Sequence, residues 1–186
     1  MNKKLLGTIV VTLTGVGLYK YFRARKPTGR AVEEWTTANM PDLTDKVIIV
    51  TGANSGIGLE AAKDFARKGA HTILACRSMD KAEAALAELQ LESPGAQAEI
   101  MQLDLASLAS VRGFAEAFKA KVDRLDVLVN NAGIMMTPYG VTEDGFEQQF
   151  GVNHLGHFAL TGLLLDRLTD TTGARVVNVS SGGHRA

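Results

Sequence analysis

The chain has 186 residues, with 20 Lys and Arg balanced by 20 Asp and Glu and with ordinary apolar and charged fractions, a composition that suits one soluble domain with an appendage. Because phosphate contacts need clustered basic residues, the zero net charge gives no electrostatic reason to expect a nucleic-acid partner. Cys76 is the only cysteine, which excludes an intrachain disulfide and favours a reducing, cytosol-facing compartment.

Residues 1–26 differ from the rest of the chain. Two lysines precede an uncharged run from Leu5 to Tyr19, and four basic residues follow it. A cleaved signal peptide is disfavoured, because the basic stretch offers no small-x-small cleavage pattern. The run is short for a bilayer of about 30 Å and spans one only if the flanking Lys and Arg side chains snorkel.

The N-terminal segment is therefore interpreted as a membrane anchor over 1–26, with a disordered leader as the alternative. More basic residues follow the apolar run than precede it, so the positive-inside rule places the folded domain on the cytoplasmic side. Pro27 and Pro41 bound a linker over 27–41, and a folded domain is expected over 42–186.

From Asp45 onward, short apolar runs alternate with amphipathic stretches. Strands are expected at 46–50, 71–76, 99–103, 125–129 and 175–179. This alternation predicts a parallel sheet covered by helices on both faces. With right-handed crossovers the strand order becomes 3-2-1-4-5, which is a Rossmann-type, doubly wound α/β fold.

The expected helices are placed by their caps and their apolar period. The apolar face of the first consists of Ile57, Ala61, Ala62, Phe65 and Ala66. Ser78 is expected to cap the second helix and Ser107 the third. A fourth helix is expected to run unbroken over 142–168.

A glycine-rich turn joins the first strand to the first helix. It reads Thr-Gly-Ala-Asn-Ser-Gly-Ile-Gly over 51–58, and glycines let such a turn approach a pyrophosphate while the helix N-terminus presents free N–H groups. A lone glycine trio is also compatible with a simple tight turn. The strand before it and the helix after it favour dinucleotide binding, by Gly52, Asn54, Ser55, Gly56, Ile57 and Gly58.

Ligands of such sheets bind beyond the carboxyl ends of the strands. The residues that follow the second and third strands are therefore candidates for contacts with the cofactor. Sites that prefer NAD place an acid at the end of the second strand, where this chain has Cys76 followed by Arg77. Arg77 favours NADP, through its 2′-phosphate, although a solvated arginine is the alternative. After the third strand, Asp104 with Leu105 is either a contact of the adenine amino group or a turn residue.

The last two strands are also followed by polar residues. Asn131, Ala132 and Gly133 are either a simple turn or a wall of the cofactor site. Asn153 lies among apolar neighbours in the fourth helix, and a half-buried amide there is expected to hold backbone or water near the crevice. Ser181 is either a loop serine or a hydroxyl that bonds a substrate oxygen.

The two histidines of the fourth helix are interpreted as structural or surface residues. His154 and His157 are three residues apart, and no third ligand with suitable spacing accompanies them. No metal site is expected.

Taken in order, the motifs at 51–58, 104, 130–133, 153 and 179–181 resemble the short-chain dehydrogenase/reductase family over 42–181. Within that span, 74–77 and 150–158 resemble its retinol dehydrogenase-like branch. The resemblance implies a membrane-anchored, NADP-preferring oxidoreductase that transfers a hydride between the nicotinamide and an alcohol or carbonyl carbon of a lipophilic substrate. It implies that Ser181 holds the substrate oxygen and that Asn153 supports a proton relay.

The chain departs from that family in one respect. The family pattern includes a Tyr followed four residues later by a Lys as the general acid/base pair, whereas the residues four beyond Tyr19, Tyr21 and Tyr139 are Arg23, Arg25 and Glu143. The chain is therefore expected to be an N-terminal fragment that lacks the C-terminal strands, binds a dinucleotide and has lost most turnover. The alternative is a non-catalytic, membrane-tethered nucleotide-binding module. An uncovered last strand predicts a homo-oligomer.

Overall fold

The computed structural model describes residues 35–181. The chain divides into two units, Met1–Asn39 and Met40–Ala186, and the described end of the first contains one 3₁₀ turn, η1 (Thr37–Asn39). The anchor expected over 1–26 lies outside the described residues. Within residues 35–181, none of the helices has the length and apolar character needed to cross a bilayer.

The second unit is built on a parallel sheet of five strands. They are β1 (Val47–Thr51), β2 (His71–Cys76), β3 (Ala98–Gln102), β4 (Val127–Asn130) and β5 (Arg175–Asn178). Their order, β3-β2-β1-β4-β5, is the predicted one, and each strand lies within two residues of its expected range. All the pairings are parallel, so the carboxyl ends of the strands meet at one edge of the sheet.

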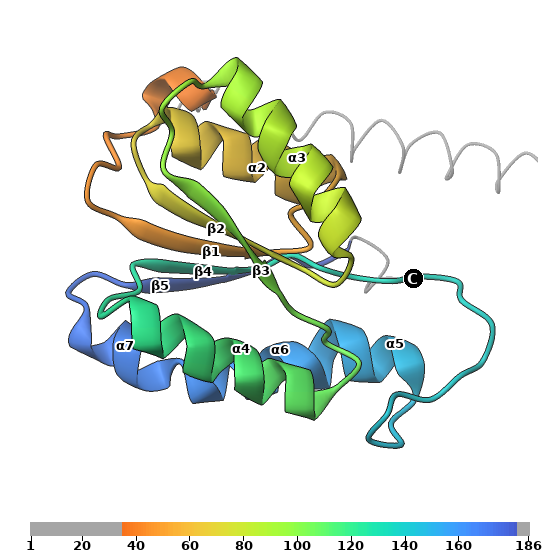
Figure 1. The fold of residues 1–186 in the computed structure, drawn as a ribbon. Coiled ribbons are helices and arrows are strands. Elements are labelled where there is room, and N and C mark those ends of the chain that lie inside the picture. The colour runs from red at the N-terminus through yellow and green to blue at the C-terminus, as the bar shows by residue number, and fades with distance from the viewer. Residues whose placement is uncertain (1–34, 182–186) are drawn as a thin grey trace, which may run out of the picture. The chain divides into compact units, whose positions relative to one another are not determined.

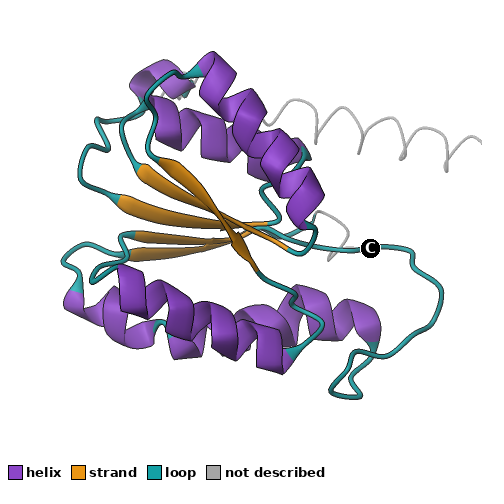
Figure 2. Ribbon diagram, in the orientation of Figure 1, coloured by secondary structure: helices purple, strands orange, loops and turns teal. Residues whose placement is uncertain are grey.

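Helices cover both faces of the sheet (Figure 1, Figure 2). One face carries α2 (Gly56–Arg67) and α3 (Met79–Glu92), and the other carries α4 (Leu108–Lys121), α5 (Gln148–Phe150), α6 (Gly156–Leu163) and α7 (Leu165–Asp170). Two buried clusters fill the layers between sheet and helices. Because side chains alternate along a strand, Ile49 of β1 enters one cluster while Ile48 and Val50 enter the other.

The strand β1 is the rigid centre of this arrangement. All five of its residues are buried, and it pairs with β2 on one side and β4 on the other. Full burial of a side chain such as Ile49 stabilises the fold by about 1.5–3 kcal/mol. The turn that follows Thr51 is therefore attached to the most constrained part of the sheet.

Two expectations about the first helices are corrected. Ile57, expected on the apolar face of α2, is 75% exposed, whereas Leu59 and Ala62 are buried. The reason is the site at the strand ends, since Ile57 lines the two cavities there while Leu59 of the same turn packs in the core with Ile48 and Val50. Ser78 stands at the N-cap of α3 without a side-chain hydrogen bond, whereas Ser107 caps α4 as expected, accepting from Ser110.

The single helix expected over 142–168 is wrong, because the structure has four segments there. The Glu147 carboxylate accepts hydrogen bonds from the N–H groups of Gln149 and Phe150, and these bonds, which also lower the pKa of Glu147, start the helix only at α5. A π turn, η2 (Gly151–Leu155), joins α5 to α6. A break at Leu164 separates α6 from α7.

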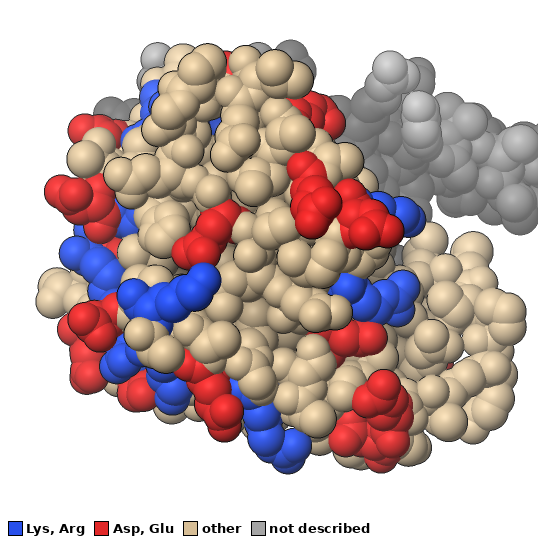
Figure 3. Space-filling view, in the orientation of Figure 1, with Lys and Arg blue, Asp and Glu red and all other residues tan. Residues whose placement is uncertain are grey.

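Charges of both signs are mixed on the face in view. In Figure 3, Lys and Arg side chains lie among Asp and Glu side chains, and no single-sign field covers that face.

Candidate functional site

Two adjoining cavities lie at the carboxyl ends of the strands. The first, cavity A, has a volume of about 930 Å³ and is lined by residues of β4 and β5, by the loops that follow these strands, and by η2 and α6. The second, cavity B, has a volume of about 390 Å³ and is lined by the ends of β1, β2 and β3. The two share the residues Ile57, Asn131, Ala132, Gly133 and Ile134. An elongated ligand could therefore occupy both.

The glycine turn forms one wall of cavity B. Gly52 and Gly56 have φ values of +66° and +57°, which L side chains adopt only at a cost. At Gly58, a Cβ atom would lie 2.6 Å from the carbonyl oxygen of Gly52 and closer still to the side-chain nitrogen of Asn131. Around Gly56 the space is open, with no atom within 4 Å of a Cβ.

This arrangement fits a pyrophosphate group. The residues of the turn at the start of α2, Ser55 and Gly56, are exposed, and the N–H groups of the first turn of a helix have no intrahelical acceptor. A helix N-terminus also carries a partial positive charge. The tight packing at Gly58 keeps the backbone of the turn close to Gly52 and Asn131, whereas the open space at Gly56 leaves room for a ligand.

Cationic groups stand at the end of β2. Arg77 and Lys81 both line cavity B and both are exposed. Burial raises the pKa of the Cys76 thiol to about 11, so it stays neutral near pH 7 and adds no negative charge beside them. Sequence reasoning singled out Arg77 but missed Lys81, whose only signal is its place in the first turn of α3.

Asp104 and Leu105 also line cavity B. The Asp104 carboxylate accepts a hydrogen bond of 2.9 Å from the N–H of Ala106, which is the turn that the sequence left open as an alternative to an adenine contact. The N–H of Asp104 in turn donates to the Ser110 hydroxyl at 2.9 Å. These bonds hold the β3–α4 loop in one conformation.

The loop after β4 is fastened to the end of β1. The Thr51 hydroxyl, fully buried, accepts hydrogen bonds of 2.9 Å from the N–H groups of Asn131 and Ala132. The side-chain amide of Asn131 donates to the Thr51 carbonyl, also at 2.9 Å. Thr51 belongs to the turn predicted from the sequence, but the role of its hydroxyl was not predicted, because its partners lie about 80 positions away along the chain.

The far end of the same loop is held by Asn153. Its side-chain oxygen accepts from the Ile134 N–H and its nitrogen donates to the Ile134 carbonyl, both at 2.8 Å. Asn153 is exposed rather than half-buried and lies in η2, which corrects the expectation on both points. Its side chain does hold backbone at the crevice, by two bonds to one residue.

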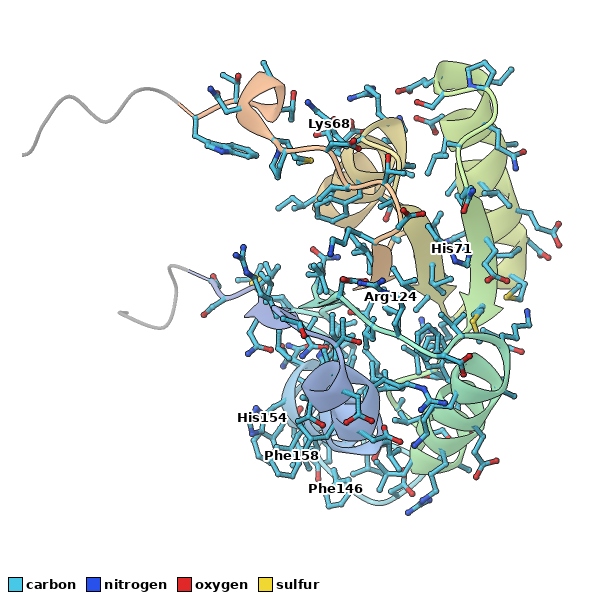
Figure 4. The ribbon with its side chains drawn as sticks, turned by 90° about the vertical axis from the view of Figure 1, so that its left-hand side faces the viewer. Lys68, His71, Arg124, Phe146, His154 and Phe158 are labelled. Carbon is cyan, nitrogen blue, oxygen red and sulfur yellow. The ribbon has the colours of Figure 1, made fainter. Side chains whose placement is uncertain are left out.

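The two histidines have different surroundings. His157 is 5% exposed, whereas His154 is exposed and its ring lies between those of Phe150 and Phe158, with centroids 5.3 Å and 6.4 Å away. His154 and Phe158 also line cavity A, and Figure 4 shows them beside each other on the same helical segment. Among residues 35–181, no group of three potential ligands is placed to hold a metal ion.

Ser181 lines cavity A together with Asn153, and it follows the end of β5. Asn130, the first residue of the 130–133 motif, also lines this cavity; its side chain donates to Asn178 across the β4–β5 pair at 2.8 Å. Tyr139 lines neither cavity and is 86% exposed. The structure thus groups the residues expected to bind a dinucleotide, all but Gly56, around cavity B, and Asn153 and Ser181 around cavity A.

Comparison with known proteins agrees with this geometry. The sequence profile described as short chain dehydrogenase matches residues 46–185. Retinol dehydrogenase 11 of Mus musculus is 53% identical over 148 residues, which are 80% of this chain and 46% of that protein. The chain spans less than half the length of the curated relatives it matches.

Solved structures share the fold. A crystal structure of a protein from Mycobacterium paratuberculosis is 50% identical, with a TM-score of 0.70 over 81% of this chain and 51% of that one. A short chain dehydrogenase from Escherichia coli CFT073, complexed with NADPH, is 30% identical, with a TM-score of 0.67 over 77% of this chain and 62% of that one. The chain therefore belongs to the short-chain dehydrogenase/reductase family.

Proposed function

We propose that this chain carries the NADP site of an oxidoreductase that transfers a hydride between the nicotinamide and the carbon of a lipophilic alcohol or carbonyl compound, such as retinol or retinal. The observation that carries the proposal is the glycine cradle of cavity B beside Arg77 and Lys81. A relative named retinol dehydrogenase 11 and a structural neighbour complexed with NADPH support the substrate class and the cofactor.

In this proposal each part of the two cavities binds a different part of the cofactor or the substrate. The turn at 51–58 and the start of α2 bind the pyrophosphate, while Arg77 and Lys81 bind the 2′-phosphate. When bound, the cofactor supplies or accepts the hydride. The Ser181 hydroxyl orients the substrate oxygen, and the apolar residues of cavity A exclude water and accept a lipophilic substrate; they include Met135, Phe158, Val176 and Val179.

Turnover by this chain is proposed to be low. None of its three tyrosines has a Lys four residues later, and a positioned acid/base group contributes about 10²- to 10⁴-fold to the rate. The same observation favours the second candidate, a non-catalytic nucleotide-binding module. Both candidates predict that the chain binds NADPH without ordinary turnover. An assay of retinal reduction with NADPH therefore tests them together, and reduction at ordinary enzyme rates would contradict both.

Replacing Arg77 by Gln is expected to weaken NADPH binding about tenfold and to leave NADH binding unchanged. A hydrogen bond to a charged group contributes about 1.5–3 kcal/mol, and the exposure of Arg77 places the effect at the lower end of that range. Isothermal titration of both cofactors measures it. Arg112→Gln, on α4, is the matched control. Equal losses for NADPH and NADH would show that Arg77 does not contact the 2′-phosphate.

We also propose that residues 1–26 attach the protein to a membrane with the folded domain on the cytoplasmic side. The support is the apolar run from Leu5 to Tyr19 with most of its flanking basic residues on the domain side. Recovery in the membrane fraction after carbonate washing, with the domain accessible to added protease in sealed microsomes, is the expected result. A fully protected domain would contradict the orientation, and loss into the wash would contradict the anchor.

Finally, we propose that the chain forms homo-oligomers through β5. This edge strand is exposed along its whole length, with Val176 and Val177 at 39% and 44% exposure, and exposed apolar edges pair with other chains. Val177→Lys is expected to shift the chain toward the monomer in sedimentation velocity. Val141→Lys, at an exposed position outside the sheet, is the control and should not. A wild-type monomer at high concentration would overturn the proposal.

A further inference from the structure

His157 is a buried, titratable side chain to which the proposed cofactor and substrate contacts assign no role. It is the second residue of α6 and is 5% exposed. Its ring nitrogens both have partners, since Nε2 lies 2.8 Å from the Thr51 hydroxyl and Nδ1 lies 3.0 Å from the Asn153 carbonyl oxygen. The ring therefore connects the two residues that hold the ends of the loop after β4.

The hydrogen bonds of Thr51 assign the tautomer of this ring. A hydroxyl has two acceptor positions and one donor, and the N–H groups of Asn131 and Ala132 occupy both acceptor positions at 2.9 Å. The Thr51 hydroxyl must then donate, and His157 at 2.8 Å is a much shorter acceptor than the Val129 carbonyl at 3.4 Å. Nε2 is thus unprotonated, and Nδ1–H donates to the Asn153 carbonyl.

The second of these bonds starts within the π turn η2, to which Asn153 belongs. A carbonyl oxygen has two acceptor positions, so the Asn153 carbonyl can accept from the ring of His157, four residues later in the chain. The side chain of the same Asn153 binds Ile134, so one hydrogen-bond chain runs from Thr51 through His157 and Asn153 to Ile134.

We propose that His157 is a positioning residue: its neutral, Nδ1–H form ties Thr51 to Asn153 and thereby fixes the loop 131–134 between the two cavities in the shape that binds the dinucleotide. The inference rests on the proposed function, because that loop lines both cavities. His157 itself acts through the residues it holds.

Protonation of the ring would disrupt this chain. A proton on Nε2 would face a hydroxyl whose acceptor positions are both filled. Burial lowers the pKa of His157 below its ordinary value of 6.5, the hydrogen bond to Asn153 raises it, and the nearby His154 lowers it further. Thr51 and the loop residues Asn131 and Ala132 carry no charge, and the buried face of α4 is apolar.

The direction of the pH dependence follows. Because the pKa is lowered in the ordered state, the ordered loop is fully favoured above pH 6.5, and acidification below 6.5 favours states in which the ring is released and protonated. Cofactor affinity should therefore decrease as the pH falls from 6.5 toward the lowered pKa of His157.

The first test is nitrogen-15 NMR of the full chain in detergent, which reads the tautomer directly. The expected result at pH 8 is a His157 ring protonated at Nδ1 and not at Nε2, with amide signals of Asn131 and Ile134 that shift at the same pH midpoint as the ring. An Nε2–H tautomer, or amide signals of Asn131 and Ile134 that do not shift when the ring titrates, would overturn the inference. This reading needs no variant to fold.

The second test compares NADP⁺ affinity at pH 8 and pH 5.5. His157→Gln offers a side-chain oxygen to the Thr51 hydroxyl but does not titrate, so it should keep the wild-type Kd within about threefold at pH 8, a margin of about 0.7 kcal/mol. Because the 2′-phosphate itself titrates near pH 6, the diagnostic quantity is the difference between proteins. We expect wild type to lose about tenfold more affinity than His157→Gln on acidification, a difference of about 1.4 kcal/mol.

His71→Gln, at the start of β2 and outside the lining of both cavities, is the matched control and should follow the wild-type pH profile. Identical profiles for wild type and His157→Gln would overturn the positioning role. A folded wild-type chain that binds no NADP⁺ at pH 8, while NMR shows the Nδ1–H ring coupled to the loop, would instead overturn the proposed function and leave the tautomer and the loop coupling established.

Discussion

Replacing Gly58 by alanine is expected to raise the Kd for NADPH at least tenfold and to lower the free energy of unfolding by about 1–3 kcal/mol, the range for overpacked sites. The added Cβ would lie 2.6 Å from the carbonyl oxygen of Gly52 and closer still to the side-chain nitrogen of Asn131. Because one of these atoms is backbone, the clash can be relieved only by moving the turn that forms the cradle. Urea unfolding and a fluorescence titration with NADPH measure the two effects.

Gly113→Ala is the matched control for this prediction. Gly113 lies within α4, and no atom lies within 4 Å of a Cβ at that position. Alanine there should leave the Kd unchanged and stabilise the chain by up to about 1 kcal/mol, since Ala has the higher helix propensity. If Gly58→Ala binds NADPH as wild type does, the close approach of the turn to the β4 loop has no part in the site.

Thr51→Val is expected to lower the free energy of unfolding by about 2 kcal/mol and to weaken NADPH binding at least tenfold. The change keeps the shape of the side chain but removes the acceptor for two backbone N–H groups, those of Asn131 and Ala132. Each polar group left without a partner costs about 1–3 kcal/mol when buried, and less here because both residues are only half-buried.

Thr51→Ser separates the hydroxyl from the methyl group. It keeps the hydrogen bonds and loses one buried methyl, which costs about 0.8 kcal/mol, so its Kd should stay near that of wild type. Binding weakened equally in the Ser and Val variants would assign the effect to packing, and unchanged binding in the Val variant would show that the loop does not need this anchor.

The sheet could be predicted because each of its strands is recognisable from the residues of that strand alone. Strand β1 is buried on both faces and reads as a continuous apolar run from Val47 to Val50, as central strands of parallel sheets do. Right-handed crossovers then leave one common order for five alternating units. The glycine turn and Arg77 were found for the same reason, since each is placed by the strand immediately before it.

The errors arose where position in the fold decides the outcome. Ile57 has the helical spacing of a core residue, but spacing does not tell that this residue lines the cavities at the strand ends. The residues over 142–168 have a continuous helical pattern, yet Glu147 caps the chain at α5 and the side-chain bonds of Asn153 to Ile134 accompany the π turn.

Thr51 and His157 make a contact that could not be predicted from the sequence. Their hydrogen bond joins residues 106 positions apart, and the bonds of Thr51 to the β4 loop span about 80. Neither residue type nor local spacing carries such a pairing, so the sequence assigned no role to the Thr51 hydroxyl and His157 was interpreted as a structural or surface residue. Only the assembled sheet brings them together.

The most direct test of the central claim is a titration of the folded, full chain with NADPH at pH 8, followed by the fluorescence of the reduced nicotinamide. Saturation at one NADPH per chain, displaced by NADP⁺ and weakened in Gly58→Ala but not in Gly113→Ala, is the predicted result. A chain whose circular dichroism shows the native fold but whose titration never saturates would contradict the assignment of cavity B as a dinucleotide site.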